Sequence, residues 1–73
     1  MDRPLVKLLD VVALLHDRPE RGLLAGHVGT VVEVLAPDVF EVEFLDEAGR
    51  TVAAEELRRE DLLLLRHRVH AAA

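Results

Sequence analysis

The segment from Gly26 to Leu35 and the alternating run after it constrain the fold of this chain more than any other feature. Gly26 and Gly29 flank two residues, and glycines at this spacing suit a tight turn and a bulge, where the backbone needs a positive φ or a close approach. A strand-like run continues to Leu35, and residues 40–44 then read Phe-Glu-Val-Glu-Phe. Strict alternation of apolar and acidic residues is typical of a half-buried strand. The two runs predict a β-hairpin in which both glycines are structural positions.

Two turns bound the alternating strand. Pro37 pre-sets φ at the first central position of a turn over residues 36–39. A second turn covers residues 46–49 and ends at Gly49, which suits the left-handed position of a hairpin turn. A further strand is therefore expected from residue 50.

Two short runs, residues 11–15 and 62–65, are apolar without interruption. Runs of this length suit strands that are covered on both faces. The segment directly after the first run, residues 16–22, is polar and contains Pro and Gly, so it is predicted to form a loop. Residues 1–9 are a lead-in, which the pattern leaves open between a single helical turn after Pro4 and an extended segment.

Residues 53–66 are ambiguous. They contain no Gly or Pro, and their Ala, Glu, Leu and Arg residues favour a helix. The apolar positions nevertheless fit one helical face poorly, because Asp61 interrupts that face and Leu62 and Leu63 lie off it. The alternative is a strand that ends near Leu57, a one-turn helix over residues 58–61 and a last strand over residues 62–65.

With that alternative, the chain is an all-β domain of five strands, at residues 10–15, 27–35, 39–45, 50–56 and 62–65. A long loop, two hairpins and a one-turn helix before the last strand connect them, which is the plan of a small five-stranded SH3-like barrel. Residues 1–73 are predicted to form a single domain, with residues 67–73 as a tail.

Composition argues against several functions. The net charge is −5, with fourteen acidic and nine basic residues, and Phe40 and Phe44 are the only aromatic residues. Nucleic-acid binding draws on a basic surface and on stacking rings, so it is disfavoured. The longest uninterrupted apolar run, residues 11–15, is far too short to span a bilayer, and no signal-peptide pattern is present. We expect a soluble cytoplasmic protein.

The chain carries no recognisable catalytic or metal-binding pattern. Without Ser, Cys or Tyr it lacks the usual nucleophiles, and we predict that it is not an enzyme and holds no metal or cofactor. Three glutamates should form a solvated outer face or pair with Arg50: Glu33, Glu41 and Glu43. The four histidines lack the spacing of a zinc site: His16, His27, His67 and His70.

Several predicted strands are apolar on both faces, whereas a five-stranded barrel has one interior. Strand alternation places Val31 and Leu35 on the same face as Glu33. The second apolar face is either covered by the lead-in residues Leu5, Val6, Leu8 and Leu9 or is a contact surface. The predicted contact positions are Val11, Leu15, Val31, Leu35, Leu63 and Leu65.

The chain resembles an uncharacterised family of short bacterial proteins known only as a domain of unknown function. The resemblance covers residues 5–66, and the glycine turn is also similar to the KOW-type motif of SH3-like barrels. The family implies an SH3-like fold without an assigned activity, which favours the strand–turn–strand interpretation of residues 53–66. The chain departs from the family pattern at two places. Asp38 stands where family members commonly carry Gly, and residues 53–56 replace a segment that is more apolar in the family. The matching motifs are Leu8–Leu15, Asp17-x-Pro19-Glu20-x-Gly22-Leu23, Gly26-x-Val28-Gly29-Thr30-Val31-Val32-Glu33-Val34-Leu35, Glu41–Phe44 and Gly49-Arg50-Thr51.

These observations lead to three hypotheses. The first is a non-catalytic module that binds another protein and also associates with itself. The second is an antitoxin or immunity protein that neutralises a neighbouring toxin, because some family members are found near toxin-type genes and an acidic chain suits a basic partner. The third, nucleic-acid binding through the KOW-like turn, ranks below both because of the acidic excess.

Overall fold

The computed structural model describes residues 5–65, which form five strands and two short 3-10 helices. The strands start and end within two residues of the predicted ranges, so the all-β prediction is confirmed. The strand–turn–strand interpretation of residues 53–66 is also confirmed, as far as residue 65. In chain order the elements are β1 (Val11–Leu14), η1 (Pro19–Arg21), β2 (Val28–Ala36), β3 (Val39–Leu45), β4 (Thr51–Arg58), η2 (Arg59–Asp61) and β5 (Leu62–Leu64).

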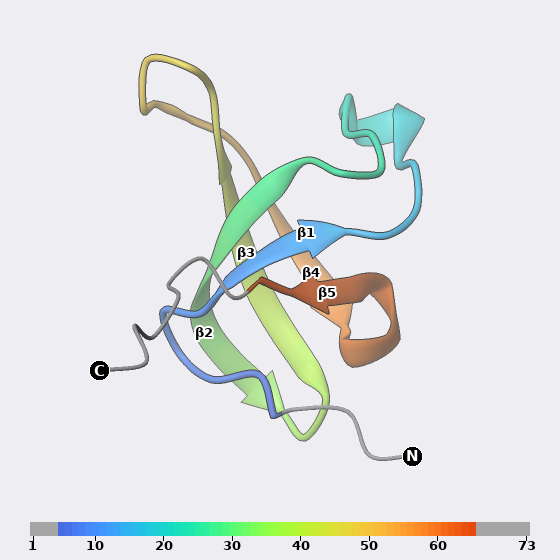
Figure 1. Cartoon of the computed structure of the whole chain (residues 1–73), viewed down its shortest axis with the longest axis vertical. Coiled ribbons are helices and arrows are strands. Elements are labelled where there is room, and N and C mark those ends of the chain that lie inside the picture. Colours follow the sequence, from blue (N-terminus) through green and yellow to red (C-terminus); the bar gives the residue numbers. More distant parts are fainter. Residues whose placement is uncertain (1–4, 66–73) are drawn as a thin grey trace, which may run out of the picture.

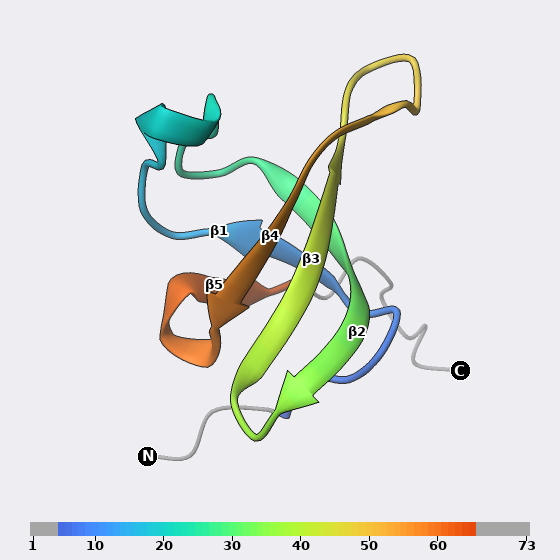
Figure 2. The same ribbon diagram turned by 180° about the vertical axis from the view of Figure 1, so that it is seen from behind.

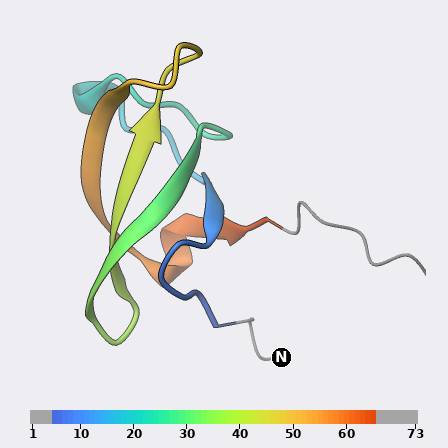
Figure 3. The same ribbon diagram turned by 90° about the vertical axis from the view of Figure 1, so that its left-hand side faces the viewer.

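The strands form one antiparallel sheet in the order β4-β3-β2-β1-β5 (Figure 1). β2 is central: its first residues pair with β1, and most of its length pairs with β3. The sheet curls, so that β1 and β5 lie across from β3 and β4 (Figures 2 and 3). Within residues 5–65 the predicted barrel closure is not observed, because β4 pairs only with β3 and β5 pairs only with β1. β4 and β5 therefore remain the two edges of an open sheet.

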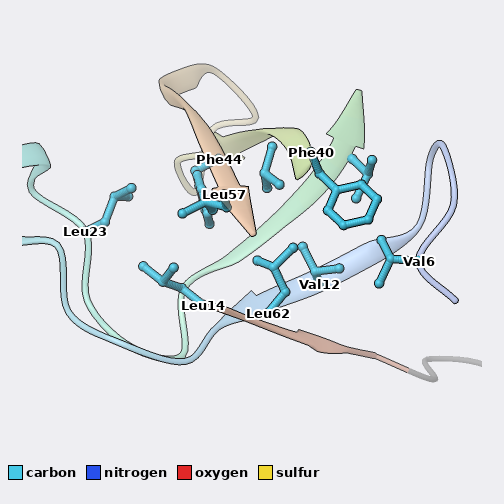
Figure 4. Packing of buried hydrophobic residues seen from close by; sticks show 10 residues of the cluster. Val6, Val12, Leu14, Leu23, Phe40, Phe44, Leu57 and Leu62 are labelled. Atoms are coloured by element: carbon cyan, nitrogen blue, oxygen red, sulfur yellow. The ribbon is translucent and has the colours of Figure 1, made fainter. Parts of the chain in front are cut away.

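The curl encloses an apolar core (Figure 4). Side chains enter it from every strand, from the long loop through Leu23 and from the lead-in through Val6. Each fully buried side chain of this kind contributes about 1.5–3 kcal/mol, so the thin core of a short chain depends on few residues. The core residues are Val6, Val12, Leu14, Leu23, Val31, Phe40, Val42, Phe44, Leu57 and Leu62.

A bulge in β2 overturns the prediction that Val31 lies on an outer face with Glu33. Val31 is 0% exposed and lies opposite Val42, whereas Glu33 is exposed. The register between β2 and β3 shifts between Val31 and Glu33, so Val32 is an extra residue on β2. An extra residue reverses the alternation, which puts Val31 into the core and Glu33 on the outside.

Five of the described residues have a positive φ, and three of them lie in turns predicted from the sequence. Gly26 has φ 94° and Gly49 has φ 82°, values that glycine adopts without strain. Asp38, in the β2–β3 turn, has φ 64°. Aspartate tolerates this region better than most residues, which explains how it replaces the glycine common in the resembled family. The Asp38 carbonyl accepts a hydrogen bond from the Arg59 backbone N–H at 3.0 Å, which ties this turn to η2.

Gly29 is required for a different reason, because other chain segments pack directly against it. It lies opposite Phe44 on β3 and Val12 on β1. A Cβ at this position would lie 2.7 Å from Val42 Cγ1 and 2.9 Å from the backbone carbonyl oxygen of Glu43. Both distances are too short for a real contact, and the carbonyl belongs to the neighbouring strand, so it cannot move freely.

Replacing Gly29 with alanine is expected to lower the free energy of unfolding by roughly 2–3 kcal/mol through this overlap. Gly49→Ala is the matched control. Nothing lies within 4 Å of its Cβ position, so only the left-handed backbone opposes the substitution, at about 1 kcal/mol. Urea denaturation of the two variants measures the difference. Equal losses would contradict a specific packing role for Gly29.

Candidate functional site

An apolar row crosses the outer face of β5, β1 and β2. Ala13 of β1 lies opposite Leu63 of β5 on one side and Val28 of β2 on the other. Leu63 is 51% exposed and Val28 is similarly exposed. Ala13 is only 8% exposed but does not belong to the core cluster. Its larger neighbours therefore cover it on the outer face.

The row continues at the β3–β4 hairpin. Gly29 lies opposite Phe44, so the next residues along, Val28 and Leu45, are neighbours. Leu45 and Val52 flank the hairpin turn, and both are exposed. We call this continuous set of residues the apolar stripe: Leu63, Ala13, Val28, Leu45 and Val52.

The structure brings only part of the predicted contact set together. The Leu65 backbone N–H donates to the Val11 carbonyl at 3.0 Å, so these two half-buried residues lie beside Leu63 on β1 and β5. Leu15 directly follows β1 and is exposed. Leu35 is also exposed but lies near the far end of β2, away from the others. Val31, as described above, is in the core.

The described part of the lead-in does not cover the second apolar face. Val6 enters the core, but Leu5 is 82% exposed, and Leu8 and Leu9 are also exposed. Side chains this exposed bury little surface against any face of the sheet. Internal cover by these leucines, the alternative to a contact surface, is therefore wrong.

The glutamates form a second outer feature, a ladder across three strands. Glu41 of β3 lies directly opposite both Glu33 of β2 and Glu56 of β4. Like charges in directly opposite positions are destabilising. None of the three forms an ion pair in the part of the chain that the structure describes. The predicted pairing of these acids with Arg50 is wrong, because the Arg50 guanidinium instead lies 3.2 Å from Asp46.

The long loop between β1 and β2, residues 15–27, is held by polar contacts at both ends and in its middle. The Arg18 guanidinium lies 3.3 Å from the Asp61 carboxylate on η2, and Arg21 pairs with Glu55 of β4. The Asp17 carboxylate accepts the Ala25 N–H at 2.9 Å. His27 Nδ1 likewise accepts the Leu24 N–H at 2.9 Å. These contacts fix the loop over the end of the sheet next to the β3–β4 hairpin.

The fixed loop and the β3–β4 hairpin enclose a groove of about 350 Å³. Leu23 of the loop and Phe44 of β3, both buried, form its floor. The exposed apolar lining residues belong to the stripe, and the remaining side chains of the lining are polar. The walls are Val28, Leu45 and Val52, and the polar lining residues are His27, Asp46 and Glu47.

A cavity of about 370 Å³ lies at the opposite end of the sheet, beside the β2–β3 turn. Leu5, Val34 and Phe40 are among its lining residues, and the nearly buried Arg59 also reaches it. Arg59 Nη1 donates to the Leu62 carbonyl at 2.8 Å, so this guanidinium has a structural role. The cavity borders residue 5, where the described chain begins.

The described residues contain no group of three or more His, Cys, Asp or Glu side chains that could hold a metal ion. Of the four histidines, His27 accepts a hydrogen bond within the long loop, and His16 is exposed in the same loop. His67 and His70 lie outside the described residues. Within residues 5–65, no helix has both the length and the apolar character needed to cross a bilayer.

A comparison with models of known protein families shows to which family this chain belongs. The family model described as Domain of unknown function (DUF4926) matches residues 8–64. The chain belongs to this family. Searches of curated proteins and of solved structures found no match. The match includes all five strands, so the apolar stripe, the glutamate ladder and the groove all lie within the DUF4926 segment.

The groove is the feature of this DUF4926 chain that sequence reasoning missed. Its walls come from a loop and a hairpin that are distant in sequence, and no local pattern predicts their approach. One signal was present: Leu23 and Leu24 are apolar residues within an otherwise polar loop. Leu23 is buried in the core, so its side chain anchors the loop against the sheet.

Neutralising Glu55 with glutamine is expected to loosen the long loop, because Arg21 then loses its charged partner. The loss of stability should be only about 1 kcal/mol, since Arg21 is half exposed. Amide hydrogen exchange in residues 15–27 should accelerate more than exchange in β3. Glu56→Gln is the matched control, since the neighbouring Glu56 faces outward and has no ion pair. Identical exchange rates in both variants would contradict the anchoring role.

Proposed function

We propose that this chain is a non-catalytic SH3-like module that binds another protein and also associates with itself. The observation that carries the proposal is the amount of apolar surface outside the core. Twelve large apolar side chains in residues 5–65 are exposed. Several of them are contiguous in the apolar stripe, and monomeric proteins rarely leave large contiguous apolar patches facing water.

The order of elements supports the SH3-like part of the proposal. A long loop follows β1, two hairpins join β2, β3 and β4, and a single 3-10 turn precedes β5. This is the order expected for a small SH3-like barrel, and the KOW-like turn lies at the start of β2. The acidic balance of the chain weighs against nucleic acid as the partner, so we place protein binding first.

The test is association of the whole chain with itself and with the product of the adjacent gene, measured by light scattering and co-purification at defined concentrations. Leu63→Thr should weaken the association about tenfold, since one contact leucine is replaced by a more polar side chain. Leu8→Thr is the matched control, because Leu8 has similar exposure but lies outside the stripe. A monomer that binds neither itself nor the neighbouring product would overturn the proposal.

A second candidate is an antitoxin or immunity protein, and the glutamate ladder favours it. Three directly opposed carboxylates without a cation partner cost stability in the isolated chain, and a basic toxin would relieve this repulsion. Cells that express the neighbouring gene should stop growing, and co-expression of this chain should restore growth. The double variant Glu33→Lys, Glu41→Lys should lose the rescue, whereas Glu60→Lys, outside the ladder, should retain it. A neighbouring product that is harmless alone would contradict this function.

A further inference from the structure

We propose that the groove between the long loop and the β3–β4 hairpin binds one large apolar side chain of a partner protein, from a segment in which Lys or Arg residues flank that side chain. The inference rests on the proposed binding function and adds the place of contact and the chemistry of the partner. It starts from a concave surface whose lining includes three apolar residues of the stripe: Val28, Leu45 and Val52.

The groove is formed before a partner arrives. Its floor consists of Leu23 and Phe44, which are core residues and have no freedom to collapse into the space. Its loop wall is held by the ion pairs of Arg18 and Arg21 and by the hydrogen bond to His27. Preorganisation of this kind lowers the entropy that binding must overcome. A volume of about 350 Å³ accommodates a leucine or phenylalanine side chain.

The charges around the groove determine what should flank that side chain. Of the two acids in the lining, Asp46 is paired with Arg50, but Glu47 is exposed and forms no ion pair within residues 5–65. Glu43, which has no ion-pair partner among the described residues, lies two residues before Leu45 on β3, and the glutamate ladder begins beyond it. A segment that extends from the groove over β3 would therefore meet unpaired carboxylates. Lys and Arg residues in that segment would be attracted, and Asp and Glu would be repelled.

The same charges argue against other occupants. A second copy of this chain would bring another net charge of −5 to a region that is already acidic. A small polar molecule is also disfavoured, because small-molecule sites need precisely placed polar groups inside an apolar pocket. Of the polar lining residues, His27 and Glu47 are exposed and His27 Nδ1 already accepts the Leu24 N–H, so neither offers a buried polar contact to such a molecule.

The experiment uses the full chain and three fluorescein-labelled peptides of about twelve residues. The first has a central Phe-Leu pair flanked by Lys and Arg, the second replaces the basic residues with Glu, and the third replaces the apolar pair with Ser. The first peptide should bind at least about tenfold more tightly than the other two, and its affinity should fall between about 25 and 250 mM NaCl. Backbone amide chemical shifts should change around Leu23, Phe44 and Val52.

Paired variants separate the groove from the overall charge of the chain. Val52→Lys should weaken binding of the first peptide about tenfold, and Glu47→Lys should weaken it about threefold. Leu8→Lys and Glu60→Lys change the net charge by the same amounts but lie outside the groove lining, so they should have less than about a twofold effect. All four positions are exposed, so the variants should fold.

Four results would overturn the inference: equal effects of Glu47→Lys and Glu60→Lys, equal binding of the acidic peptide, no binding of any peptide, or shift changes confined to another surface. Concentration-dependent shifts of the groove-floor residues Leu23 and Phe44 without peptide would identify a second copy as the occupant of the groove and would also overturn the inference, whereas shifts confined to the area around Leu63 fit self-association through the rest of the stripe. None of these results decides the broader binding function, because that proposal is tested separately with Leu63→Thr and the neighbouring gene product.

Discussion

The close packing of β3 against Gly29 is the contact on which the rest of this structure depends. Gly29 lies on the central strand, between Val12 on β1 and Phe44 on β3, where no space remains for a Cβ atom. This approach lets Val42 and Phe44 reach the middle of the core while β1 lies across from them. The sheet can therefore curl tightly enough to enclose ten core side chains in a chain of 73 residues.

The curl leaves the molecule with one interior and two outer surfaces of different character. On β5, β1 and the start of β2, the outward positions are apolar, and the described lead-in does not cover them. On β2, β3 and β4, the outward positions carry Glu33, Glu41 and Glu56 in one row. The groove lies at one end of the apolar stripe, at Val28 and Leu45, and Glu43 lies between it and the glutamate ladder along β3. This arrangement suits a partner that offers both apolar and basic side chains.

The sequence predicted most of the fold because local patterns carried the information. The alternation at residues 40–44, Pro37 in the first turn and Gly49 in the second set the strands and their connections, and membership of the DUF4926 family is consistent with the motifs of residues 8–64. The site was predicted less well. Leu63, Val11 and Leu65 do lie together on an outer face, but Val31 does not, because the bulge at Val32 is not visible in a pattern of consecutive valines.

The sequence by itself determined that the chain forms five short antiparallel strands, with turns at Gly26, Pro37 and Gly49, and that it carries more apolar residues than one small core requires. Tertiary structure alone decided that the sheet stays open at β4 and β5, that Val31 turns inward, and that the long loop forms a groove with the β3–β4 hairpin. The physical reason is distance along the chain. Turn and strand preferences act over a few residues, whereas Arg21 meets Glu55, and Leu23 meets the core, only after the sheet has curled.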